Sequence, residues 1–312
     1  GNERERLPED LKNTALALDD DVTVPENVRF LLACADVQKN RFCVQVFGVA
    51  PAADGFDVIC IDRIDIIKSK RKDEDGDALW VKPATHVEDW WLLKEQVLDK
   101  VYPLSDSSGV MGIKMMACDS GGRDGVTANA YSFYRQLRDK GDGAHKRFML
   151  IKGDGNPAAP RVRVSYPDSA TKDRKAGARG EIPVLMINGN ILKDKLNGML
   201  DARMGDGAFL LADYLPDEVF VEMTVERRTP KGWEKPKGSR VRNEAWDLAT
   251  YSLALCAHLR VESIRWDQPP VWAAEWPDNA LVVPVTTAEP VKEIALKAKP
   301  RYDLSRLAAD LA

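Results

Sequence analysis

The sequence has few residues of the kinds that build histidine or cysteine metal centres, and it has no long apolar run. Its 312 residues include three histidines and five cysteines, which show neither a CxxC pair nor zinc-finger spacing. No stretch of about eighteen consecutive apolar residues occurs, so no segment predicts a transmembrane helix. The cysteines lie mostly in apolar stretches, which is typical of reduced, packed thiols and predicts a cytosolic compartment.

The sequence also lacks the G-x-x-x-x-G-K-[ST] pattern of a phosphate-binding loop, so we expect no ATPase activity. Its net charge of −4 at first argues against nucleic-acid binding. Basic residues are nevertheless concentrated locally. Residues 226–243 contain seven Lys and Arg against two Glu, and residues 152–181 contain seven against four acids. Such stretches supply phosphate contacts whatever the total charge.

The order of apolar patterns predicts an α/β protein with a mixed sheet. Three apolar stretches rich in Val, Ile, Phe and Cys predict consecutive antiparallel strands at 28–36, 42–50 and 57–66. A charged loop at 68–77 follows. The remaining patterns alternate helices with strands that we expect to be parallel: helices at 85–100, 127–138, 191–200, 218–223 and 243–259, and strands at 110–118, 148–151 and 183–187.

Composition divides the chain into three parts. Residues 1–25 are charged and predict an exposed leader, and the Pro-rich residues 269–312 predict an irregular tail. Between them, residues 26–268 predict one folded domain with two basic insertions. These are a Gly- and Pro-rich loop at 153–181 and a hairpin at 224–242 that turns at residues 230–232.

Acidic residues at the ends of predicted core elements are the strongest functional signal. Asp36 and Asp119 each follow an apolar strand, whereas Glu244 and Asp247 are spaced i, i+3 at the start of an apolar helix. Carboxylates from several elements that converge on one place bind Mg²⁺ or Mn²⁺, and two such ions support phosphodiester hydrolysis. Each acid also has a structural alternative: a turn for Asp36, an Asx-type turn for Asp119, and helix capping for the pair.

Basic residues complete the predicted site. Lys152 follows a predicted strand and could stabilise transition-state charge, although a lysine there is often only solubilising. The basic hairpin suits DNA contact, with a solvated loop as the alternative. Its candidate DNA-binding residues are Arg227, Arg228, Lys231, Lys235, Lys237, Arg240 and Arg242.

Five short motifs follow one another along the chain: Ala35-Asp-Val-Gln38, Cys118-Asp-Ser-Gly-Gly122, Ile151-Lys-Gly153, Val225-Glu-Arg-Arg228 and Arg242-Asn-Glu-Ala-Trp-Asp247. In this order they resemble the motifs of large terminase subunits of lambda-like bacteriophages, and the last motif, before an apolar helix, is the most specific. The resemblance covers roughly residues 25–265 and corresponds to the C-terminal nuclease portion.

The resemblance implies a ribonuclease-H-like mixed β-sheet flanked by helices on both faces. It implies a two-metal Mg²⁺ or Mn²⁺ endonuclease that cuts concatemeric double-stranded viral DNA during packaging in the host cytoplasm. Asp36 and Asp119 correspond to metal-ligating strand acids, either Glu244 or Asp247 to the helix acid, and Lys152 to a basic position implicated in cutting. The implied partners are a small terminase subunit and a portal protein, and the leader would connect to an ATPase motor that this chain lacks.

Two other functions fit the same residues. The fold could be a non-catalytic DNA-docking or assembly module of the packaging motor. It could also be a ribonuclease-H-like resolvase that applies the same acids to branched DNA. Cleavage that depends on metal and on Asp36 would separate an enzyme from a docking module, and a preference for linear duplex over four-way junctions would exclude a resolvase.

Overall fold

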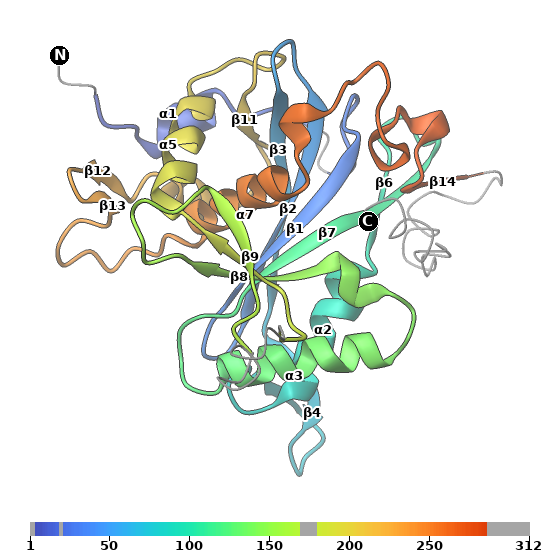
Figure 1. Ribbon diagram of the computed structural model, residues 1–312, viewed down its shortest axis with the longest axis vertical. Coiled ribbons are helices and arrows are strands. Elements are labelled where there is room, and N and C mark those ends of the chain that lie inside the picture. The colour runs from blue at the N-terminus through green and yellow to red at the C-terminus, as the bar shows by residue number, and fades with distance from the viewer. Residues whose placement is uncertain (1–3, 19–20, 169–179, 286–312) are drawn as a thin grey trace.

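One mixed β-sheet forms the centre of the protein (Figure 1). The computed structural model describes residues 4–18, 21–168 and 180–285. Within these residues the main sheet has ten strands, and its path runs β11-β3-β2-β1-β7-β8-β10-β9, with β6 and β14 pairing β7. The strands are β1 (Phe30–Val37), β2 (Phe42–Pro51), β3 (Phe56–Ile66), β6 (Val101–Pro103), β7 (Gly109–Asp119), β8 (Phe148–Gly153), β9 (Val162–Ser165), β10 (Val184–Ile187), β11 (Phe209–Leu211) and β14 (Val282–Pro284).

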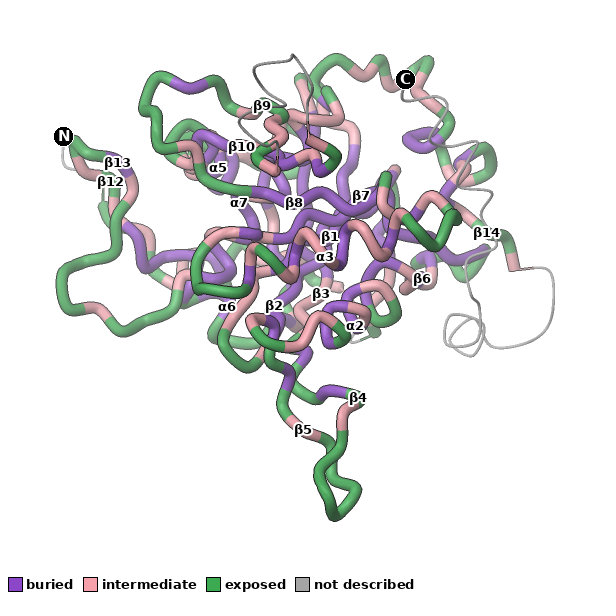
Figure 2. Tube along the Cα trace, turned by 60° about the horizontal axis from the view of Figure 1, so that its bottom comes forward, coloured by how far each residue is buried: buried purple, intermediate pink, exposed green. Residues whose placement is uncertain are grey.

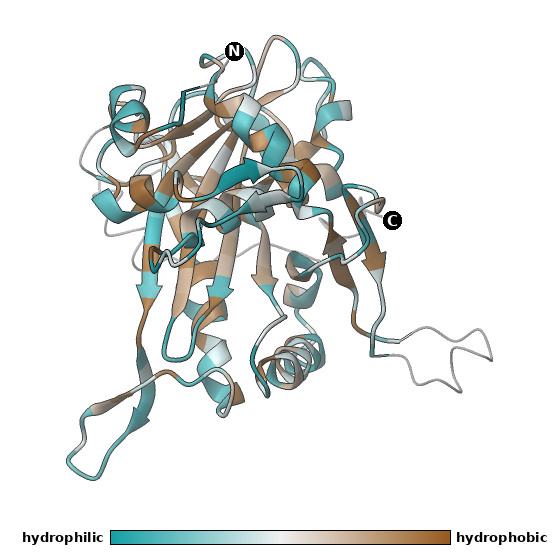
Figure 3. Ribbon diagram, turned by 90° about the vertical axis from the view of Figure 1, so that its left-hand side faces the viewer, coloured by the Kyte–Doolittle hydropathy of each residue, from teal (hydrophilic) through white to brown (hydrophobic). Residues whose placement is uncertain are grey.

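The predicted strand directions are confirmed. Strands β1, β2 and β3 form antiparallel hairpins, and β7, β8 and β10 continue the sheet in parallel with β1. The central strands are apolar along their length, as expected for the parallel part of a sheet that is covered on both faces. In Figure 2, β1 and β7 are almost entirely buried, and in Figure 3 the sheet strands are mostly hydrophobic.

Helices cover both faces of the sheet, as expected for a ribonuclease-H-like fold. On one face lies α7 (Glu244–His258), which contacts β1, β2 and β7 and packs against α5 (Gly189–Leu200) and α6 (Asp217–Glu222). On the other face, α3 (Val126–Asp139) and the helical turns at 87–98 bring Phe133 against Phe148 and Trp90 against Phe42. Helix α7 is apolar nearly all round because it is buried between the sheet and these helices.

The helical segment expected at 85–100 is irregular. It consists of a 3₁₀ turn at Val87–Trp90, a short α-helix, α2, at Trp91–Leu93, and a π-turn at Lys94–Leu98. Its N-cap is His86, and no side chain accepts a capping hydrogen bond there. A good cap is therefore missing, and packing of Trp90, Leu93 and Leu98 stabilises the segment instead.

Residues 68–77, expected as a charged loop, instead begin a projecting hairpin. Strands β4 (Lys68–Lys72) and β5 (Ala78–Trp80) pair outside the main sheet, and Figure 2 shows the hairpin extending from the body with mostly exposed residues. Strand β4 was not predicted because the contacts that stabilise it are ion pairs, of Arg71 with Asp89 and of Lys70 with Glu95. An alternating apolar pattern is therefore absent.

Residues 269–285 pack on the sheet rather than forming an irregular tail. Trp272 is buried and meets Phe30 edge-on at 5.1 Å between ring centroids, and β14 pairs with β7. The end of the expected tail, 286–312, lies outside the described residues, as do 169–179 of the expected basic loop and 1–3 and 19–20 of the leader. The described part of the leader contains α1 (Pro8–Asn13). None of the helices in the described ranges is long and apolar enough to cross a membrane.

Candidate active site

Asp36 is the carboxylate that strand β1 delivers at the edge of the core. It pairs in register with Cys43 and is half-buried, directly after a run of fully buried residues. Its Oδ2 accepts a hydrogen bond from the Gln38 side chain at 2.5 Å. Burial, followed by the charge of Asp119, raises the pKa of Asp36 from 3.8 to about 7. An isolated surface turn residue would not show such a shift.

Asp119 lies at the same edge because β7 is the parallel neighbour of β1 and pairs Cys118 with Ala35. Its Oδ1 accepts from the Gly121 amide at 2.8 Å, which is the Asx-type turn considered from the sequence. Its Oδ2 accepts from the Tyr251 hydroxyl at 3.0 Å. Burial raises the pKa of Asp119, whereas these two hydrogen bonds and the charge of Lys152 lower it. The turn therefore fixes the position of the Asp119 carboxylate and favours its charged form.

Helix α7 brings the third carboxylate. Asp247 and Tyr251 are spaced i, i+4 and share one helical face. Burial raises the pKa of Asp247, which the ammonium of Lys193 opposes from 3.1 Å. The pKa of the Tyr251 hydroxyl is raised well above 10 by burial and by the charges of Asp119, Asp247 and Asp36. One hydroxyl therefore lies in the field of carboxylates from two strands and one helix.

Glu244, the other helix acid, has different partners. Its carboxylate accepts from Arg41 and lies 3.4 Å from the Arg63 guanidinium. Arg63 also binds Glu222 at 3.1 Å, and Glu222 accepts the Ala245 amide at 2.9 Å in the first turn of α7. These contacts form an arginine cluster (Arg41, Arg63, Asp65, Glu222 and Glu244) that fixes the start of the helix. Glu244 is thus balanced by the guanidinium groups of Arg41 and Arg63, with that of Arg242 at 3.9 Å, whereas Asp247 pairs with the ammonium of Lys193.

The donor set can be compared with what a divalent cation needs. The described residues contain no three Asp, Glu, His or Cys side chains already gathered tightly enough to hold a metal ion. The chemistry of the donors nevertheless fits Mg²⁺ or Mn²⁺, because Asp36, Asp119 and Asp247 offer oxygen ligands alone. Burial and then the charge of Asp119 raise the pKa of Asp36, and a bound cation would offset both.

The predicted basic residues fall into two groups. Lys152 is exposed at the end of β8, next to the residue that pairs with Asp119. Within the segment 224–242, expected as a hairpin, β12 (Arg227–Thr229) and β13 (Gly232–Glu234) pair antiparallel. Arg227 and Arg228 pair with Glu5 and Asp194 at 3.1 and 2.9 Å, so they hold the hairpin in place. The other five hairpin cations are exposed: Lys231, Lys235, Lys237, Arg240 and Arg242.

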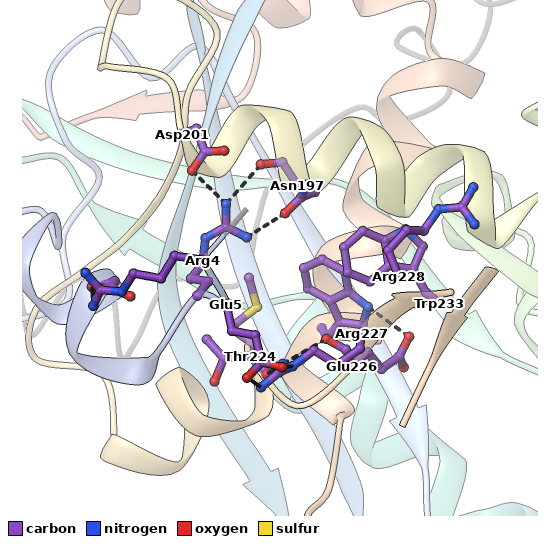
Figure 4. A pocket seen from close by; sticks show the side chains of 13 residues that line it. Arg4, Glu5, Asn197, Asp201, Thr224, Glu226, Arg227, Arg228 and Trp233 are labelled. Carbon is purple, nitrogen blue, oxygen red and sulfur yellow. Dashed lines mark hydrogen bonds and ion pairs between the residues drawn. The ribbon is translucent and has the colours of Figure 1, made fainter. Parts of the chain in front are cut away.

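A polar pocket of about 710 Å³ separates this hairpin from the N-terminal segment. Figure 4 shows Arg227 reaching toward Glu5 and Thr224, with Glu226 and Trp233 on the hairpin side. Arg6 binds Asp201 at 2.7 Å and Asn197 at the end of α5. The arginines that line the pocket are largely paired with acids, and these pairs link the hairpin and the N-terminal segment to neighbouring elements. We therefore assign the pocket no anion-binding role.

Three residues near the carboxylates had not been singled out from the sequence: Tyr251, Lys193 and Glu226. Tyr251 had a usable signal, since it follows Asp247 by four residues on a helix. Lys193 had none, because it meets Asp247 only through the packing of α5 against α7. Glu226, which contacts Lys193 and Trp246, lies in the quoted motif Val225-Glu-Arg-Arg228 but had no role assigned to it.

Comparison with known proteins identifies the family of the chain. The family described as terminase large subunit gpA, endonuclease domain, matches residues 4–266, which is most of the chain. No curated protein matches. No solved structure matches either.

Proposed function

The chain belongs to the terminase large-subunit endonuclease-domain family, a family of nucleases that act in DNA packaging, and we propose that it cuts double-stranded viral DNA by two-metal hydrolysis with Mg²⁺ or Mn²⁺. The observation that carries this proposal is the presence of three partly buried carboxylates, Asp36, Asp119 and Asp247, whose charges act together on the Tyr251 hydroxyl, which donates a hydrogen bond to Asp119. Concatemeric DNA as the substrate, and a small terminase subunit and a portal protein as partners, belong to the same proposal, as does action in the host cytoplasm.

Each residue has a role that follows from its contacts. Asp36, Asp119 and Asp247 would hold the cations, which when bound supply the Lewis acidity that activates water and neutralises developing charge. Tyr251 orients Asp119 through its hydrogen bond. Lys152, exposed beside Asp119, is placed to stabilise charge on the scissile phosphate. We assign Glu244 to the arginine cluster and Asp247 to the metal site, because Glu244 is already neutralised.

Plasmid cleavage tests the proposal. The protein is incubated with supercoiled plasmid and Mn²⁺, beside an EDTA control and Asp119→Asn. We expect nicking or linearisation by the parent alone. DNA binding without cleavage by folded parent protein would favour the docking module, and preferential cutting of four-way junctions would favour the resolvase.

The exposed hairpin lysines are expected to contact phosphates. Replacing Lys231, Lys235 and Lys237 with Gln should weaken duplex binding by at least tenfold at about 100 mM salt. It should also reduce the slope of log K against log salt by about 2–3, since each lost phosphate contact removes about 0.9. Fluorescence anisotropy across a salt series measures both. Lys12→Gln on α1, whose ammonium pairs with Asp217 at 3.0 Å, is the control. Equal slopes for the triple variant and the parent would remove the hairpin from the DNA interface.

A further inference from the structure

Lys193 places a positive charge inside the carboxylate site. It lies on α5, and its ammonium is 3.1 Å from Asp247 and 2.9 Å from Glu226. Its side chain is only 15% exposed, so water screens these contacts weakly. Burial alone would lower the pKa of Lys193, but the charges of Asp247 and Glu226 reverse this and raise it. Lys193 is therefore a charged ammonium held between two carboxylates.

The two carboxylates hold Lys193 unequally. Glu226 is buried and accepts two further hydrogen bonds, from Asn243 at 2.6 Å and from the Trp246 indole at 3.1 Å. It is thus fixed in place by the start of α7. In the described part of the chain, the carboxylate of Asp247 forms its ion pair with the ammonium of Lys193. Loss of the Lys193–Asp247 contact would leave Lys193 bound to Glu226 and Asp247 available to another cation.

We propose that Lys193 is a resident cation that occupies Asp247 and competes there with one of the two divalent metals. The inference rests on the proposed metal site. It predicts that the two ions bind unequally: one is held by Asp36 and Asp119, and the other binds only when Asp247 leaves Lys193. Since Lys193 touches a carboxylate and not the reacting atoms, it is a positioning residue that sets the metal requirement.

Manganese binding without DNA tests the proposal directly. Free Mn²⁺ is measured by electron paramagnetic resonance in titrations of the full chain, so the readout does not depend on cleavage. We expect Lys193→Met to bind the second Mn²⁺ about tenfold more tightly than the parent, because a nearby positive charge is removed. Lys193→Arg should behave like the parent because it keeps the charge. Lys195→Met is the matched control, since Lys195 is on the same helix and pairs with Glu262 at 3.2 Å.

The outcomes distinguish this inference from the proposed function. Unchanged or weaker second-ion binding in Lys193→Met, with normal binding by the parent, would overturn the inference and leave the metal site intact. No Mn²⁺ binding by any variant or by the parent would overturn both. If Lys193→Met fails to fold, as judged by circular dichroism, Lys193→Gln replaces it. The amide keeps a hydrogen-bond donor for Glu226 without the charge, and the same tenfold tightening is expected.

Discussion

Asp36→Asn is expected to be more stable than the parent in EDTA at pH 8 and to lose plasmid cleavage by at least about a hundredfold. The pKa of Asp36 rises from 3.8 to about 7 through burial and the charge of Asp119. At 1.36 kcal/mol per pKa unit, its ionisation costs the folded state at most about 4 kcal/mol. We expect a gain of about 1–3 kcal/mol in the variant, because relaxation reduces the full penalty. Urea unfolding and plasmid nicking measure the two effects.

The pH dependence of this gain has a definite sign. Well below its ordinary pKa of 3.8, Asp36 is protonated in both folded and unfolded states, so parent and variant should be equally stable in this respect. As the pH rises from 4 to 7, the unfolded parent releases the proton first, and the parent loses stability that the variant retains. The difference should be complete above about pH 7.

Manganese should reverse this order of stabilities. Binding of Mn²⁺ to the folded parent should raise the midpoint of its urea unfolding, whereas Asp36→Asn lacks a metal ligand and should respond little. Asp54→Asn, an exposed change in the β2–β3 turn, controls for the loss of one negative charge. A variant less stable than the parent at pH 8 in EDTA would show that Asp36 has a structural role and carries no stored repulsion.

Arg63→Met should be the most destabilising single change in the arginine cluster, at about 3–5 kcal/mol. The Arg63 side chain is 3% exposed and lies 3.1 Å from Glu222 and 3.4 Å from Glu244, both buried. Its removal leaves two buried carboxylates with less compensation, which is the costly way to break a buried ion pair. The free energy of unfolding from urea titration measures the effect.

A second change should restore part of this loss. Glu222→Gln in the Arg63→Met background removes one uncompensated charge, so the double variant should be more stable than the sum of the single effects predicts. Arg265→Met is the matched control, because Arg265 is 69% exposed and pairs with Asp267 on the surface. It should cost less than about 0.5 kcal/mol. A loss below about 1 kcal/mol for Arg63→Met would show that the cluster does not fix the start of α7.

The central sheet could be predicted from the sequence because its strands are apolar and locally connected. The runs that became β1, β2 and β3 need only short turns, so their antiparallel order follows from adjacency. The short strands β6 and β11 were not predicted. Each has only three residues: β11 pairs with β3, far along the chain, whereas β6 pairs with the neighbouring β7. Patterns of such length carry too little periodicity to distinguish strand from loop.

The residues of the candidate site also differ in how well the sequence predicts them. Asp36 and Asp119 were visible because a carboxylate at the end of a buried strand is unusual. Glu244 and Asp247 could not be distinguished, since residues three apart on a helix share a face. The structure separates them by their partners: Arg41 and Arg63 come from the β-sheet, and Lys193 comes from α5. Those contacts depend on packing between distant elements, which local sequence does not encode.

Anomalous diffraction from crystals soaked in Mn²⁺ tests the metal site most directly. We expect an anomalous peak within roughly 2.0–2.4 Å of carboxylate oxygens from both Asp36 and Asp119. At higher Mn²⁺ a second peak should appear at Asp247, with Lys193 displaced onto Glu226. Crystals that take up Mn²⁺ only elsewhere, while the same protein cuts plasmid, would contradict the assignment of these three carboxylates as the metal site.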